Sequence, residues 1–98
     1  MRKLIWSKRA TKSFLKILDF IEEDSIQNAQ KVSLEVLRIV NSSSKNPEHH
    51  RRDKYKIENN NGSFRAFEIH SIRISFFYDT KVLRIVRVRH TKRKPLNY

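Results

Sequence analysis

Hydrophobic positions in the first half of the chain recur at the spacing of helices. A short apolar stretch at 3–6 predicts a strand, after which Ser7 can accept a backbone N–H bond and begin a helix. This helix is predicted to end near Glu23, and a second helix to span 26–40, so that the two form a hairpin. The apolar stripes consist of Ala10, Phe14, Ile17, Leu18 and Ile21, then Ala29, Val32, Val36, Ile39 and Val40.

After a polar loop at 46–53, the pattern changes to that of strands. Stretches at 55–58, 63–70, 72–78 and 82–89 are rich in aromatic and β-branched residues and are separated by turn signals. They predict an antiparallel meander. A strand, two helices and a meander indicate an α+β fold in one domain, 1–98, with the helical hairpin packed on one sheet face.

Side chains two positions apart in a strand share a face, which predicts the residues that face the helices. The more apolar set is predicted to face them: Phe64, Ala66, Ile72, Ile74, Phe76, Val82, Val86 and Val88. The other set is predicted to lie on the uncovered face: Arg65, Phe67, Arg73, Ser75, Phe77, Leu83, Ile85, Arg87 and Arg89. Arginines from three successive strands would therefore converge there. Arg84 shares the spacing of the core-facing valines and does not fit this assignment.

Charge and composition narrow the partners without selecting one. The chain has 22 Lys and Arg against 10 Asp and Glu, a net charge of +12, which attracts RNA, DNA, a ribosome or an acidic protein. Cysteine is absent, and the adjacent His49 and His50 are poorly spaced to chelate one metal, so we expect neither a metal nor another cofactor. No apolar run approaches the roughly 18 residues that cross a bilayer. We expect a cytoplasmic protein without a membrane partner.

The segment 82–98 places cations beside an imidazole and a phenol, groups from which RNA cleavage without a metal can be assembled. His90 follows a predicted strand, and Tyr98 is the last residue of the sequence. The neighbouring cations could equally hold a polyanion by electrostatic attraction alone. This segment is the leading candidate for a functional site.

Several short motifs, in this order, resemble the RelE/ParE toxins of bacterial type II toxin-antitoxin systems. IWSKRATKSFLKILDFIEED looks like the opening strand and helix of that family, and an Asn-Pro-Glu loop, FRAFEI, HSIRISFFY and VLRIVRVRH look like its meander. The resemblance implies a microbial-ribonuclease-like fold and growth arrest, either by cleavage of messenger RNA on the ribosome or by inhibition of DNA gyrase. It also implies a cognate antitoxin, and the charge of +12 favours an acidic, partly disordered one.

Ribonuclease members of the family carry a basic sheet face and Arg, His or Lys with a Tyr near the C-terminus. Arg73, His90, Lys92, Arg93 and Tyr98 resemble that set, so the sequence favours a metal-independent endoribonuclease. The N-terminal half looks at least as similar to ParE as to RelE. A gyrase inhibitor without nuclease activity is therefore the alternative.

RNA cleavage by the ribose 2′-OH requires a base, an acid and a clamp for the phosphorane oxygens. We predict Arg73 and Arg65 as clamps, His90 as acid or base, and Tyr98 as a stacking or positioning residue. Lys92 or Lys54 could serve as a base if neighbouring cations lower its pKa. Arg73 has an alternative role as the cross-strand partner of an acid such as Glu68 or Glu58. The remaining nucleic-acid-binding candidates are Lys54, Lys56, Arg87, Arg89, Arg93 and Lys94.

Overall fold

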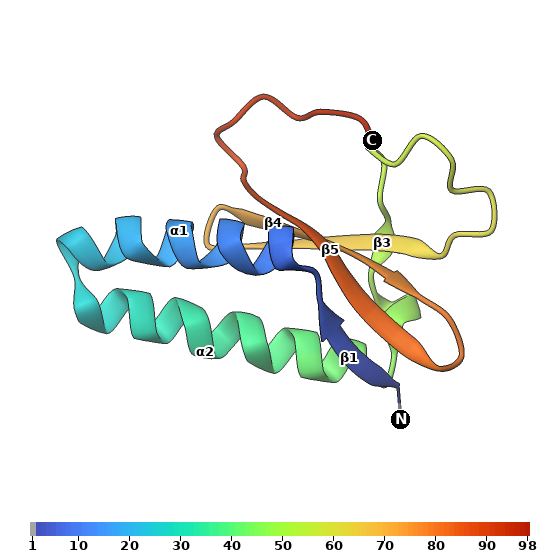
Figure 1. Ribbon diagram of the computed structural model, residues 1–98, viewed down its shortest axis with the longest axis horizontal. Helices are drawn as coiled ribbons and strands as arrows, with labels where there is room; N and C mark the ends of the chain where they lie inside the picture. The colour runs from blue at the N-terminus through green and yellow to red at the C-terminus, as the bar shows by residue number, and fades with distance from the viewer. Residues whose placement is uncertain (1) are drawn as a thin grey trace.

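The computed structural model describes residues 2–98 and shows two helices packed against one face of a sheet (Figure 1). The sheet has five strands in the order β1-β5-β4-β3-β2; β1 runs parallel to β5, and the other neighbours are antiparallel. The predicted α+β arrangement is confirmed. The elements are β1 (Lys3–Trp6), α1 (Lys8–Asp24), α2 (Ile26–Ser43), the 3₁₀ turn η1 (Pro47–His49), β2 (Arg51–Arg52), β3 (Phe64–Ile69), β4 (Ile72–Tyr78) and β5 (Val82–His90).

Serine side chains set the helix boundaries. The Ser7 hydroxyl accepts a hydrogen bond from the Ala10 amide at 3.0 Å and begins α1. Ser25 both ends α1, through its amide, and begins α2, through its hydroxyl, which makes the hairpin link a single residue. At the far end α2 continues beyond the predicted Val40, because the Ser43 hydroxyl bonds back to the Ile39 carbonyl at 2.7 Å and is accommodated inside the helix.

The core lies between the two helices and the central strands β4 and β5. Trp6 stacks on Phe14 with ring centroids 5.4 Å apart, which ties the edge strand β1 to the start of α1. The best buried core side chains, each at most 2% exposed, are Ala10, Val32, Val36, Val40, Ile72, Ile74, Phe76, Leu83 and Ile85.

The first half of β5 faces the opposite way from the prediction, because a β-bulge interrupts the strand. Ser75 pairs with Arg87 but Phe76 pairs with Ile85, which leaves Val86 as an extra residue. Leu83 and Ile85 are consequently in the core at 0% exposure, and placing them on the uncovered face was wrong. The bulge also resolves the position of Arg84, whose side chain is exposed.

The predicted faces of β3 are also reversed. Residues directly opposite each other in an antiparallel pair share a face, and Arg65 pairs with Phe76 while Phe67 pairs with Ile74. Arg65 therefore lies on the helix-facing side, whereas Phe64 and Ala66 lie on the other side. The register follows from the two-residue turn at 70–71, where both residues have positive φ angles of 52° and 62°.

The predicted strand at 55–58 is absent, and a short strand forms earlier, within the predicted polar loop. Arg51 and Arg52 of β2 pair with Ala66 and Arg65 of β3. The chain then turns at Asp53, whose carboxylate accepts a hydrogen bond from the Tyr55 amide at 3.1 Å. This turn overrides the strand propensity of the residues that follow.

We predict that Leu83→Ala lowers the free energy of unfolding by about 2–5 kcal/mol, because it removes a fully buried side chain from the core. Leu34→Ala is the matched control, since Leu34 is 69% exposed and its truncation should change stability by about 0.5 kcal/mol or less. Urea denaturation measures both. Equal effects of the two substitutions would contradict the bulged register of β5.

Candidate functional site

The uncovered face of the sheet is partly covered by the last eight residues. The segment 91–98, here called the strap, leaves β5, crosses above the sheet and ends beside the loop at 53–62 (Figure 1). Strap and loop are joined by backbone hydrogen bonds, from the Tyr98 amide to the Tyr55 carbonyl at 2.9 Å and from the Ile57 amide to the Tyr98 carbonyl at 2.7 Å. The loop is itself closed by Asn59, whose side chain bonds both the amide and the carbonyl of Phe64.

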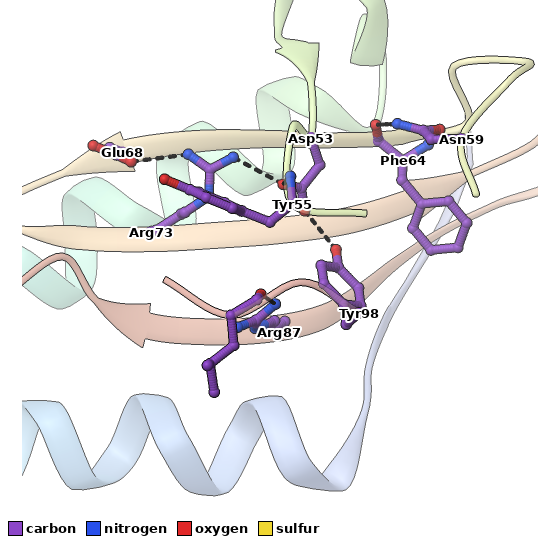
Figure 2. A network of polar contacts seen from close by, with 9 residues as sticks. Asp53, Tyr55, Asn59, Phe64, Glu68, Arg73, Arg87 and Tyr98 are labelled. Atoms are coloured by element: carbon purple, nitrogen blue, oxygen red, sulfur yellow. Dashed lines mark hydrogen bonds and ion pairs between the residues drawn. The ribbon is translucent and has the colours of Figure 1, made fainter. Parts of the chain in front are cut away.

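A buried carboxylate lies where the strap, the loop and the sheet meet. Asp53 is 2% exposed, and its Oδ1 accepts hydrogen bonds from Arg73 Nη2 at 2.9 Å and from the Tyr55 amide. Its Oδ2 accepts from the Tyr98 hydroxyl at 2.5 Å (Figure 2). We call Asp53, Tyr55, Glu68, Arg73 and Tyr98 the Asp53 network.

Both terminal nitrogens of Arg73 are bonded to carboxylates. Nη1 donates to Glu68 Oε2 at 2.8 Å, across the β3–β4 pair, and Nη2 donates to Asp53. The guanidinium also lies over the Tyr55 ring at 4.8 Å. Burial opposes its charge, but the two carboxylates outweigh burial and raise the pKa of Arg73 above its ordinary value. Arg73 therefore has the cross-strand acid partner that the alternative interpretation of the sequence named.

The Tyr98 ring is enclosed by cations and an aromatic ring. The Arg87 guanidinium lies 4.6 Å and the Lys56 ammonium 5.1 Å from the ring centroid, and Phe64 approaches it at 6.5 Å with the ring planes nearly perpendicular. Burial and the bond to Asp53 raise the pKa of Tyr98. For Asp53, burial alone would raise the pKa, but the bonds from Tyr98 and Arg73 hold it below its ordinary value.

Strap and sheet enclose a hollow of about 130 Å³ beside this network. Arg87 Nη1 closes one side by donating to the Leu96 carbonyl at 2.5 Å. The charged and titratable side chains that line the hollow are Glu68, Arg73, Arg87, Arg89, His90 and Arg93.

Five of the eleven candidate site residues line this hollow: Arg73, Arg87, Arg89, His90 and Arg93. Arg65 lies on the other side of the sheet, where it bonds the carbonyls of Gly62 and His50 at 2.8 and 2.9 Å. Lys92 borders a separate groove between α1 and the end of β5. Lys54 lies over the Tyr55 ring at 5.3 Å, and the Lys94 side chain is exposed on the strap.

His90, at the end of β5, has a defined tautomer when neutral. Its Nδ1 accepts a hydrogen bond from the Lys92 amide at 3.1 Å, so the ring proton of the neutral imidazole is on Nε2. His90 pairs with Ile72, whose side chain is on the helix-facing side of the sheet. The imidazole therefore lies toward the helix-facing side, and His90 lines both the groove beside α1 and the hollow.

Asp53 is the member of this site that the sequence interpretation missed. Its position before Tyr55 is typical of a turn in which Asp bonds a backbone amide two residues later. That signal indicates a turn but does not indicate that the Asp53 carboxylate is buried. Its burial depends on Arg73 and on Tyr98, and Tyr98 lies 45 positions later in the sequence.

The described residues contain neither a metal-binding cluster nor a membrane-spanning helix. Within residues 2–98, no three His, Cys, Asp or Glu side chains gather in a group that could hold a metal ion. Within the same residues, no helix is both long enough and apolar enough to span a bilayer.

The chain folds as a helical hairpin on a mixed sheet, an α+β arrangement of the kind that the toxin resemblance implied. Comparison with protein families matches residues 4–95 to the family described as "ParE toxin of type II toxin-antitoxin system, parDE". The chain belongs to this family and is thus a toxin of a type II toxin-antitoxin system, which implies an antitoxin partner. Comparison with curated protein sequences gives no match.

We predict that Tyr98→Phe lowers the free energy of unfolding by about 1–3 kcal/mol, because it removes a hydrogen bond to a buried, charged carboxylate. Tyr55→Phe is the matched control, since the Tyr55 hydroxyl makes no hydrogen bond within residues 2–98. Chemical denaturation compares the two variants. A smaller loss for Tyr98→Phe than for Tyr55→Phe would contradict the role given to the phenol.

The lowered pKa of Asp53 predicts a specific acid sensitivity. A carboxyl whose folded pKa is depressed stabilises the folded state fully above its unfolded value, near 3.8, and this contribution is lost as the pH falls through the lower folded value. Stability should therefore fall below about pH 4. In Asp53→Asn the fall across this window should be smaller, although the protein is less stable at neutral pH. Asp19→Asn, on the exposed side of α1, should keep the wild-type profile in denaturation measured against pH.

Proposed function

We propose that this toxin arrests growth by inhibiting DNA gyrase and that it does not cleave RNA. The observation that supports the proposal is the Asp53 network. In it, Arg73 and Tyr98, two side chains that cleavage would use, both donate hydrogen bonds to Asp53. Gyrase inhibition without nuclease activity is the alternative that the sequence analysis left open. The proposal also places the toxin in the cytoplasm, where gyrase acts.

Arg73 is poorly suited to clamp a phosphorane. A clamp uses two parallel N–H groups of one guanidinium, and both terminal nitrogens of Arg73 are occupied by Asp53 and Glu68. A phosphate in their place would have to displace carboxylates of like charge, one of them buried. The second predicted clamp, Arg65, lies on the opposite side of the sheet.

The acid and base positions are also unfavourable. The Tyr98 hydroxyl already donates its hydrogen bond to Asp53, and its raised pKa makes the phenol a weaker acid than an exposed tyrosine. Neutral His90 carries its proton on Nε2 and uses Nδ1 to accept the Lys92 amide, so neither nitrogen has a free lone pair with which to remove the 2′-proton.

A toxin without its own chemistry must act by binding, and the surface charge supports two partners. The net charge of +12 complements an acidic protein segment, which we propose as the part of the antitoxin that covers the toxin. When that segment is removed, the same cationic surface becomes available to gyrase. Electrostatic attraction of this kind raises the rate of association and depends on salt concentration.

Cleavage of ribosome-bound messenger RNA is the second candidate, and one observation favours it. Arg87, Arg89 and Arg93 gather at the hollow beside His90, and all four residues are among the predicted site. Displacement of the strap would release the Tyr98 phenol and leave Arg87 and Arg89, on β5, open to an RNA phosphate.

We expect the purified toxin to inhibit supercoiling by purified gyrase, and cells that express it to show no new 5′ ends in primer extension on their transcripts. His90→Gln should remain toxic and inhibitory, because the imidazole has no chemical role in gyrase inhibition. His70→Gln, in the β3–β4 turn, is the matched control. New 5′ ends that disappear in His90→Gln but persist in His70→Gln would instead establish the nuclease.

A further inference from the structure

We propose that the hollow beneath the strap binds one oxyanion of the phosphate class. The hollow is the space of about 130 Å³ between the strap and the uncovered face of β4 and β5. The proposal goes beyond gyrase inhibition and does not depend on it.

The lining of the hollow carries positive charge that the described residues do not neutralise. Arg87, Arg89 and Arg93 form no ion pair within residues 2–98, and Glu68, the acid in the lining, is bonded to Arg73. Burial and the nearby Arg89 guanidinium lower the pKa of Arg87. Like charges in a partly buried space destabilise one another, and a bound anion removes that repulsion.

Hydrogen-bond donors are also left over at this place. Arg73 Nε is buried and has no hydrogen-bond partner within residues 2–98, although both terminal nitrogens of the same side chain are bonded. Buried N–H groups without a partner are rare and call for a ligand or an ordered water. Arg89 makes only a long contact, 3.4 Å, to the Lys94 carbonyl, and Thr91 lines the same space.

The volume limits the ligand. A space of about 130 Å³ has room for one tetrahedral oxyanion beneath the strap. The ligand is therefore free phosphate, or the terminal phosphate of a nucleotide whose sugar and base stay outside the strap.

Titration of the intact protein with inorganic phosphate tests the proposal, with sodium chloride at equal ionic strength as the reference. Binding is followed by calorimetry and by the shift in Tm. Wild type and Arg84→Gln should bind phosphate equally, since Arg84 is exposed on the same strand outside the hollow. Arg89→Gln should lose about tenfold or more in affinity, because it removes a charge-assisted donor.

A second pair of ligands identifies the source of the oxyanion. Stronger binding of adenosine monophosphate than of phosphate indicates a nucleotide end, and equal binding indicates the free ion. Adenosine should not bind, and binding as strong as that of the monophosphate would overturn the proposal. If Arg89→Gln does not fold, Arg93→Gln on the exposed strap replaces it. Equal losses in the hollow variant and in Arg84→Gln, or no preference for phosphate over chloride, would show general attraction of anions and overturn the proposal.

Discussion

The uncovered face of this toxin depends on one buried carboxylate. Asp53 joins three segments that are distant in the sequence: the loop through the Tyr55 amide, the sheet through Arg73 and the strap through the Tyr98 phenol. Removal of one partner from a buried ion pair typically costs about 3–5 kcal/mol, because the other charge is left without compensation. The strap is exposed from 91 to 97, and this anchor holds its end while Arg87 bonds the Leu96 carbonyl along its length.

The same carboxylate determines which chemistry the site can support. By accepting from Tyr98 and Arg73, it keeps the phenol neutral and the guanidinium charged, which stabilises the fold but occupies two groups that a nuclease would need. Residue types typical of phosphoryl chemistry are therefore a weak indicator of catalysis here. Their hydrogen-bond partners distinguish a structural network from a catalytic site.

The sequence predicted those parts of the fold that depend on local signals. Both helices follow from apolar spacing and from serine caps at Ser7 and Ser25, which act within one turn of the chain. The face of β3 was also predictable, since a two-residue turn at 70–71 places Ile69 opposite Ile72, on the helix-facing side. The bulge at Val86 was not, because alternation of side chains is the assumption that a bulge breaks. For the site, Arg73 was predicted, but Asp53 was missed because its burial arises only after distant segments meet.

From the distribution of charge, we expect the proposed anion to have most effect on the strap side rather than on the helices. The helical residues Lys8, Arg9, Lys12 and Lys16 are exposed, and water with its ions screens their mutual repulsion. The arginines beneath the strap are partly withdrawn from solvent, so that screening is weaker and their repulsion is felt more strongly. An anion placed there relieves more repulsion than one placed on the helices. Any acidic partner of this basic protein therefore gains most by reaching the strap, whose position the Asp53 network holds.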